Sequence, residues 1–197
     1  MCGIVAYIGN KDPKPIILDG LERMEYRGYD SAGILLCNNF ESQLTKISGK
    51  VDSLSKILET KQQISTHLGI GHTRWATHGI PDEKNAHPHI SNSGKLHIVH
   101  NGIIENFDTI KKELSQRGYS FYSDTDSEVL VNLIDEIKVK ENVKLSEAVQ
   151  LALNQVVGAY GVVICDISNP SELVVARLGS PLAIGLGNES FYVGSDA

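Results

Sequence analysis

The chain has 197 residues, of which 41% are hydrophobic and 21% charged, and its formal net charge is −6. This composition is typical of one globular domain, and the acidic balance argues against a nucleic-acid partner, which would usually require a basic patch. No apolar run reaches the roughly 18 residues of a transmembrane helix and no secretory signal opens the chain, so we expect a cytoplasmic protein without a membrane anchor.

The first half of the chain mixes short apolar strands with amphipathic helices. Residues 2–9 carry apolar side chains on both faces, which predicts a strand buried between two layers. Pro13 or Pro15 can open a helix that stops near residues 26–28. Further expected elements are strands over 31–37, 42–47 and 68–75, a helix over 51–63 and a loop over 77–93.

The second half adds helices before a closing run of strands. Asn106 can cap a helix that ends at Gly118, and Thr125 and Glu128 form a capping-box pattern at the start of the next helix. Short connections between neighbouring strands favour antiparallel pairing, so pattern alone predicts an α+β domain. The other expected elements are a helix over 145–157 and strands over 95–100, 159–167, 172–177, 182–186 and 191–194.

The three cysteines have different surroundings. Cys37 and Cys165 each end an apolar run, which indicates buried structural thiols, and the odd number of cysteines argues against a disulfide framework. Cys2 becomes the first residue if Met1 is removed, and its thiol then lies beside its own α-amino group. An α-amine with an unperturbed pKa of roughly 7.7–8.0 can accept the thiol proton, so Cys2 is a candidate nucleophile that carries its own base. The alternative is a small residue near a frayed end.

Four other residues have both a functional and a structural interpretation. Arg74 at a strand end could clamp a carboxylate through its planar fork, or be a solvated charge. The Asn101 side chain and the Gly102 backbone could form an oxyanion hole, or a hairpin turn. Asp126 could bind a ligand ammonium, or simply complement the dipole of the helix that it opens.

The seven histidines do not predict a metal site. His87 and His89 lie near His97 and His100 in the sequence, which raises the question of zinc. No cysteine completes a ligand set, and His97 and His100 point to opposite faces of an ideal strand. We therefore expect no metal.

Together and in this order, the motifs resemble the class II glutamine amidotransferases, which belong to the N-terminal-nucleophile hydrolases. Within that class they are most similar to the glutamine–fructose-6-phosphate aminotransferases. The resemblance covers nearly the whole chain. The segments that carry it are CGIV at 2–5, LERMEYRGYDSAG at 21–33, HTRWATHG at 72–79, NAHPH at 85–89, HNGIIEN at 100–106 and TDSE at 125–128.

The resemblance implies a four-layer αββα sandwich of two antiparallel sheets and a glutaminase that needs no cofactor. Cys2 would attack the side-chain amide of L-glutamine and form a thioester, releasing ammonia, while Asn101 and Gly102 would stabilise the oxyanion. The other roles that it implies are binding of the glutamine carboxylate by Arg74 with Thr77 and His78, binding of its ammonium by Asp126, gating by Trp75, and a place for Arg27 beside the covered nucleophile.

The family also has a part that nothing in this chain matches. Residues 1–197 would form a type 2 glutamine amidotransferase domain that lacks its last part, and the sugar isomerase domains would be absent. In the full-length enzyme, which we expect to be a homo-oligomer, ammonia would go to fructose 6-phosphate to give glucosamine 6-phosphate. Two alternatives stay open: an N-terminal-cysteine hydrolase of other amides, and a binding module that keeps Met1.

Overall fold

The computed structural model describes residues 2–75 and 82–196, and their strands form two antiparallel sheets. In chain order the strands are β1 (Gly3–Gly9), β2 (Ser31–Cys37), β3 (Ser42–Ser48), β4 (Leu68–Arg74), β5 (His89–Ile90), β6 (Leu96–Ile104), β7 (Gly158–Asp166), β8 (Val174–Leu178), β9 (Ala183–Gly187) and β10 (Ser190–Gly194). The first sheet has the order β3-β2-β4-β1-β10-β9, and the second has the order β5-β6-β7-β8.

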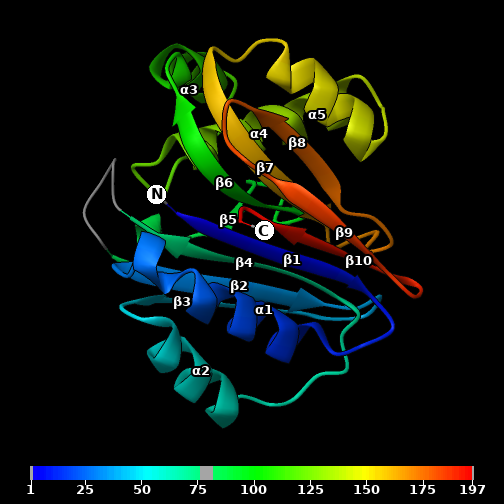
Figure 1. Cartoon of the computed structure of the whole chain (residues 1–197). Helices are drawn as coiled ribbons and strands as arrows, with labels where there is room; N and C mark the ends of the chain where they lie inside the picture. The colour runs from blue at the N-terminus through cyan, green and yellow to red at the C-terminus, as the bar shows by residue number, and fades with distance from the viewer. Residues whose placement is uncertain (1, 76–81, 197) are drawn as a thin grey trace.

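Helices cover the outer face of each sheet. They are α1 (Pro13–Arg23), α2 (Val51–Thr60), α3 (Phe107–Gln116), α4 (Asp126–Lys140) and α5 (Leu145–Leu153). Figure 1 shows α1 and α2 against the first sheet and α3, α4 and α5 against the second. The α+β class and the four-layer αββα sandwich are therefore confirmed. Within the described residues, no helix combines the length and the apolar composition that crossing a membrane requires.

Three apolar layers hold the four structural layers together. Along β1, Ile4 and Ala6 face the second sheet, whereas Val5 faces α1, so the prediction that both faces of this strand are buried is confirmed. Burial of each such aliphatic side chain stabilises the fold by roughly 1.5–3 kcal/mol. Cys37 and Cys165 lie fully buried in the layer between the sheets, as predicted.

Helix α1 begins and ends for local reasons. Asp12 accepts a hydrogen bond from the Lys14 backbone N–H at 3.0 Å, and Pro13 supplies a pre-set backbone angle at the first turn. The helix ends at Arg23, earlier than predicted, and the chain continues as a short 3-10 helix, η1 (Glu25–Arg27). This tighter turn sets the direction in which Arg27 leaves the helix.

Several boundaries differ from the sequence-based expectation. The predicted loop over 77–93 contains another 3-10 helix, η2 (Glu83–Asn85), and the strand β5, while residues 76–81 lie outside the described part of the chain. The predicted helix over 145–157 stops at Leu153. Asn106 occupies the cap position of α3, but its side chain bonds the carbonyl of Gln155 and the N–H of Val157, each at 2.9 Å, in place of capping.

The interpretation of Asn101 and Gly102 as a hairpin turn is wrong. Strand β6 continues through both residues to Ile104, and Gly102 pairs with Tyr160 of β7. Gly102 has a φ of +140°, and a Cβ atom there would lie 2.0 Å from the Ala159 carbonyl oxygen. Only glycine fits this close approach, because any other residue would place its Cβ atom against the Ala159 carbonyl. The backbone of β6 is therefore irregular at Gly102.

Candidate active site

Cys2 lies immediately before β1 and beside the end of β4. Because Gly3 pairs with Thr73 in the first sheet, the residue after β4, Trp75, comes next to the Cys2 side chain. The Trp75 N–H donates to the Cys2 Sγ at 3.2 Å. Burial raises the pKa of the Cys2 thiol, and the contact with the Trp75 backbone opposes that rise. The thiol is therefore protonated near neutral pH and needs a base before it can attack.

Asn101 reaches the same place from the second sheet. Its Nδ2 donates to the Cys2 carbonyl oxygen at 3.0 Å, which links β6 to the start of β1. An amide nitrogen has two hydrogens, so this contact uses one and leaves a second N–H. The tertiary structure thus brings an amide donor beside the candidate nucleophile, although the two residues are 99 positions apart.

Two adjoining cavities share Cys2 as a wall. One, of about 230 Å³, is lined by Cys2, Asn101 and Gly102 together with Arg27, Trp75, Ile103, Ser180 and Pro181. The other, of about 30 Å³, is lined by Cys2, Arg74 and Asp126 together with Trp75, His87, His100, Gly102, Thr125 and Ser127. The structure therefore gathers the predicted nucleophile, oxyanion donors and charged residues around one continuous region.

The two charged residues both line the smaller cavity and are almost fully buried. Arg74 ends β4 with 4% of its surface exposed, and its carbonyl accepts the Asp30 N–H at 3.2 Å. Asp126 begins α4 with 5% exposed, and its carboxylate accepts the Ile104 N–H at 2.8 Å. A buried carboxylate that bonds the end of β6 does more than complement a helix dipole, since it is anchored at the cavity wall.

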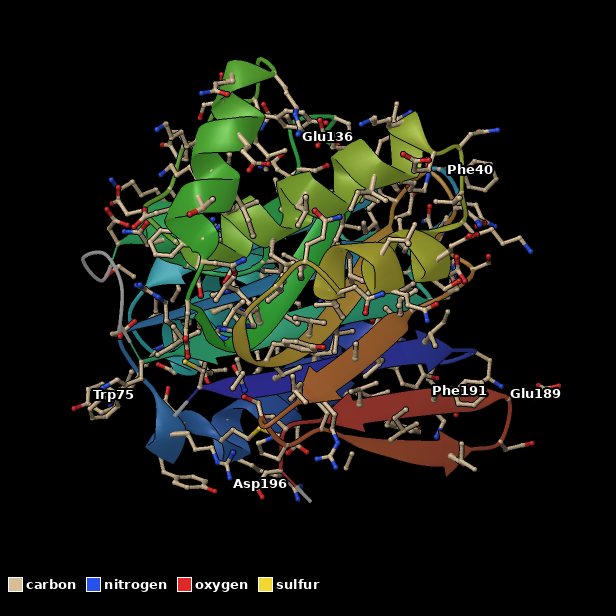
Figure 2. All side chains as sticks on the ribbon, turned by 90° about the horizontal axis from the view of Figure 1, so that it is seen from above. Phe40, Trp75, Glu136, Glu189, Phe191 and Asp196 are labelled. Atoms are coloured by element: carbon tan, nitrogen blue, oxygen red, sulfur yellow. The ribbon has the colours of Figure 1, made fainter. Side chains whose placement is uncertain are left out.

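The two residues with an expected covering role lie at the rim. Arg27 forms an ion pair with Asp196 at 2.8 Å and donates to the Ser195 carbonyl at 3.2 Å, which attaches η1 to the end of the chain. Trp75 is 49% exposed, and Figure 2 shows its side chain at the edge of the molecule. Its indole packs edge to face against the Tyr29 ring, with the ring centroids 5.9 Å apart. Thr77 and His78 lie outside the described residues.

Sequence reasoning missed a cluster of four buried histidines, two of which, His87 and His100, line the smaller cavity. Ser127 Oγ lies 2.9 Å from His87 Nε2 and 2.8 Å from His100 Nδ1. The His87 ring also lies 4.1 Å from that of His72 and 4.5 Å from that of His89, measured between ring centroids. Burial lowers the pKa of all four histidines, to about 3 for His72, which keeps them neutral. The alternation of side chains along β4 and β6 was the available signal, since it places His72 on the same face as Ile70 and Asn101 on the same face as Val99, both of which face the layer between the sheets.

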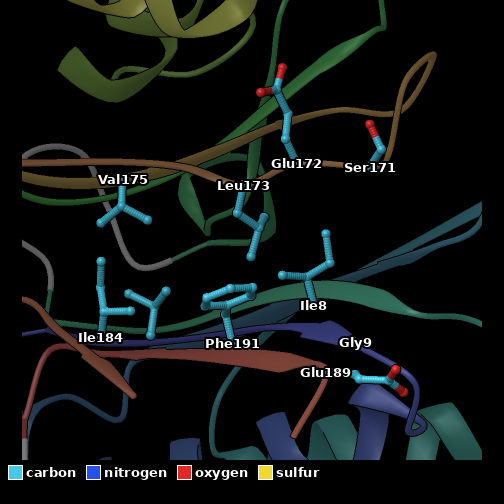
Figure 3. A pocket seen from close by; sticks show the side chains of 10 residues that line it. Ile8, Gly9, Ser171, Glu172, Leu173, Val175, Ile184, Glu189 and Phe191 are labelled. Atoms are coloured by element: carbon cyan, nitrogen blue, oxygen red, sulfur yellow. The ribbon is translucent and has the colours of Figure 1, made fainter. Parts of the chain in front are cut away.

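A larger cavity, of about 480 Å³, lies at the far end of β1. Its walls are mainly aliphatic and aromatic, and Figure 3 shows the side chains of Ile8, Leu173 and Phe191 converging in it. Glu172 and Glu189 are the charged residues of its lining. Its lining residues include no cysteine, histidine, lysine or arginine, so size alone does not identify the functional site. Among the described residues, no group of three or more His, Cys, Asp or Glu side chains could hold a metal ion.

Comparisons with known proteins agree with this geometry. A family model described as a glutamine amidotransferase domain matches residues 72–197. The chain is 52% identical, over 198 residues, to the glutamine–fructose-6-phosphate aminotransferase (isomerizing) of Bacteroides thetaiotaomicron, and 50% identical, over 200 residues, to that of Chlorobaculum tepidum. Each match covers 100% of this chain and 32% of the relative, so the chain spans about a third of the length of these relatives.

Solved structures share the fold. The glutamine phosphoribosylpyrophosphate amidotransferase from B. subtilis, in complex with ADP and GMP, superposes with a TM-score of 0.82 at 26% identity, covering 98% of this chain and 42% of that one. A glutamine aminotransferase class-II domain protein from Silicibacter pomeroyi gives a TM-score of 0.66 at 15% identity, covering 99% of this chain and 89% of that one. The second likeness concerns the fold alone.

Proposed function

The chain belongs to the glutamine amidotransferase domain family, and from this premise we propose that it hydrolyses L-glutamine to glutamate and ammonia through Cys2. The observation that carries the proposal is the meeting of the Cys2 thiol with the Asn101 amide at one cavity, beside a second cavity that holds Arg74 and Asp126. A nucleophile, an oxyanion donor and two opposite charges are what a zwitterionic amide substrate requires.

The proposed reaction begins when removal of Met1 frees the α-amino group of Cys2. This amine takes the thiol proton, Sγ bonds to the amide carbon of glutamine, and the carbonyl π electrons move onto oxygen. The second N–H of Asn101 and the Gly102 N–H donate to the resulting oxyanion. Collapse breaks the C–N bond, and ammonia leaves with the proton that the amine returns. Water then attacks the thioester, the amine takes its proton, and glutamate departs as the thiol regains that proton.

The charged walls would hold the amino-acid end of the substrate. The Arg74 guanidinium fits a carboxylate through two parallel hydrogen bonds, and the Asp126 carboxylate complements an ammonium. Thr77 and His78 would assist Arg74. Trp75 and Arg27 would cover the cavity, which agrees with their place at its rim.

The fate of the ammonia is proposed from the relatives. They are named glutamine–fructose-6-phosphate aminotransferases, and this chain corresponds to about a third of their length. We propose that residues 1–197 act as the glutaminase part of such an enzyme. Ammonia would then pass to fructose 6-phosphate, bound by sugar isomerase domains, in a protein that forms a homo-oligomer.

Substitution of the nucleophile tests the proposal directly. In Cys2→Ala, ammonia release from glutamine should fall by on the order of 10⁶-fold, the loss that removal of a catalytic nucleophile causes in a hydrolase. Cys165→Ala removes a buried thiol that lines neither cavity beside Cys2 and should keep glutaminase activity. Wild-type turnover in Cys2→Ala would refute the assignment.

Blocking the amine provides an independent test. A chain with an extra residue before Cys2, verified by intact mass, should fold normally and lose glutamine hydrolysis, because its α-nitrogen becomes an amide without basicity. Rates with glutamine and with simple acyl amides then separate a glutaminase from a general amide hydrolase. Equal rates with both substrates would contradict the proposed role of Arg74 and Asp126.

A further inference from the structure

His72 joins the two sheets at the point where the oxyanion donor sits. It lies in β4 with no exposed surface, whereas Asn101 lies in β6 of the other sheet. His72 Nε2 is 2.9 Å from Asn101 Oδ1 and 3.1 Å from the His100 carbonyl oxygen. Because a backbone carbonyl can only accept, Nε2 must carry the hydrogen, and His72 is therefore a donor toward both oxygens.

The orientation of the Asn101 amide follows from its two contacts. The Cys2 carbonyl oxygen, 3.0 Å away, can only accept, so the amide nitrogen faces Cys2 and the amide oxygen faces His72. If the amide were flipped, its oxygen would face the Cys2 carbonyl oxygen and its NH₂ group would face the His72 Nε2–H. Neither pair could form a hydrogen bond. The contacts at the two ends therefore select the same orientation, in which an N–H is left for the 230 Å³ cavity.

Placing His72 here is costly for the fold. Its Nδ1 is buried and has no hydrogen-bond partner among the described residues. A buried polar atom without a partner destabilises a protein, and an apolar residue at this position would avoid that cost. The ring is also neutral, since burial lowers its pKa to about 3, so it does not serve as a cation for the oxyanion. What remains for the side chain to supply is its single Nε2–H.

We propose that His72 is a positioning residue that locks the Asn101 amide with its N–H directed at the nucleophile. This inference rests on the proposed function, because an oriented donor matters only if an oxyanion forms at that cavity. His72 shares the first sheet with the start of β1, where Ile4 pairs with His72 itself. The same ladder that places Cys2 therefore places the group that orients Asn101.

The inference predicts a specific kinetic signature. Asn101 lines the 230 Å³ cavity, whereas Arg74 and Asp126 line the other one, which is the proposed site for the charged end of glutamine. Loss of the His72 donor should therefore lower kcat for glutamine and leave KM nearly unchanged. A loosened amide still visits the productive orientation, so the loss should be smaller than for removal of the donor itself, on the order of 10–10²-fold against 10²–10³-fold.

The experiment compares His72→Leu and His72→Asn, which lack a donor at the Nε2 position, with His72→Gln, whose longer amide can place an N–H there. We expect kcat to fall in the first two and to recover in His72→Gln to within about threefold of wild type, with thermal unfolding recorded for each. If His72→Leu does not fold, His72→Asn and His72→Gln, which both keep a polar amide, carry the comparison.

Coupling to Asn101 separates positioning from general structural support. In an Asn101→Ala background, His72→Asn should cost no further activity, because the group it orients is gone. Alkylation of Cys2 by iodoacetamide forms no oxyanion and should proceed at the wild-type rate in all His72 variants. An equal loss of kcat in both backgrounds, or a loss in His72→Gln equal to that in His72→Asn, would overturn the inference.

Loss of the glutaminase role and loss of the His72 role give different experimental results. If the wild-type chain with a free Cys2 amine releases no ammonia from glutamine, the proposed function itself is wrong. If the wild-type chain is active and His72→Asn matches it in kcat, the proposed function stands and the positioning role of His72 is refuted.

Discussion

Cavities lie at both ends of strand β1, and those at the Cys2 end differ from the one at the Gly9 end in volume and in the polarity of their lining residues. At the Cys2 end, small cavities are surrounded by buried polar groups that come from both sheets. At the Gly9 end, a cavity of about 480 Å³ is lined mainly by apolar side chains such as Ile8, Leu173 and Phe191. Figure 3 shows these apolar side chains pointing toward one another, with Ser171 and the carboxylates of Glu172 and Glu189 around them.

The difference shows what makes a cavity a reaction site in this fold. Volume and apolar surface favour the Gly9 end, whereas convergent polar groups favour the Cys2 end. Buried polar groups carry a desolvation cost that apolar packing avoids, so a fold accumulates them where they have a use. The Cys2 end holds four buried histidines as well as Arg74 and Asp126, and it is therefore the more costly end to build.

The largest expected difference between the two ends of β1 is a loss of stability at the Cys2 end when the pH is lowered. Burial lowers the pKa of His72 from 6.5 to about 3, so between these values the unfolded chain binds a proton that the folded chain excludes. Stability is complete above about pH 6.5 and falls as the pH drops toward 3, by about 1.4 kcal/mol per pH unit for this group. His87 and His89 shift in the same direction. Urea unfolding at pH 7 and pH 5 measures the loss.

Amide hydrogen exchange can show which strands lose stability at low pH. At pH 5, after correction for intrinsic exchange, amides of β4 and β6 near Cys2 should lose protection before those around the apolar cavity. The slope of stability against pH should be smaller in His72→Gln, which lacks one of the buried imidazoles. A flat pH profile between 7 and 5 would mean that the histidines are not neutral and buried as the structure places them.

Removal of the oxyanion donor should have the next largest effect. Asn101→Ala is expected to lower kcat for glutamine by on the order of 10²–10³-fold with little change in KM. Asn106→Ala is a matched control, because this asparagine bonds a loop near α3 and lines neither Cys2 cavity. If KM rose by as large a factor as kcat fell, Asn101 would contribute to binding of the glutamine ground state and its role as an oxyanion donor would be contradicted.

Replacement of the guanidinium should have a smaller effect on a different parameter. Arg74→Lys keeps the charge and loses the second parallel hydrogen bond, so KM for glutamine should rise about tenfold while kcat changes less. Steady-state kinetics measure both values, and Arg177→Lys in β8 provides a control at a surface arginine. If kcat falls and KM does not, Arg74 acts on the transition state and the binding role is wrong.

Substitution at the opposite end should have the smallest effect. Phe191 lines the apolar cavity and is 53% exposed. Phe191→Ser is therefore expected to lower stability by about 1 kcal/mol and to keep kcat/KM within about twofold of wild type. A large loss of glutaminase activity in this variant would show that the two ends are coupled and would weaken the contrast between them.

Most of the elements could be predicted from local pattern, and their ends could not. Apolar side chains on both faces of residues 2–9 predicted β1, and the Asp12 and Pro13 pattern explains why α1 begins where it does. Helix α5 stops at Leu153, four residues before its predicted end, because the chain there turns to bring Val157 against Asn106. That contact joins residues 51 positions apart, and no local propensity contains it.

The candidate site divides in the same way. The sequence by itself determined the chemistry: a cysteine next to the chain start, an Arg and an Asp of opposite charge, and an Asn-Gly pair that could donate to an oxyanion. The tertiary structure alone decided that Asn101 and Gly102 lie within a strand rather than a turn. It also brought His72 to the Asn101 amide.

The physical reason is the range of the forces involved. Residue type sets pKa, charge and hydrogen-bonding capacity, so reactive groups can be recognised one at a time along the chain. Their mutual distances depend on how two sheets pack, which is fixed by apolar layers made of residues from β1, β4, β6 and β7. Desolvation of His72 and the orientation of Asn101 exist only once those layers have closed around them.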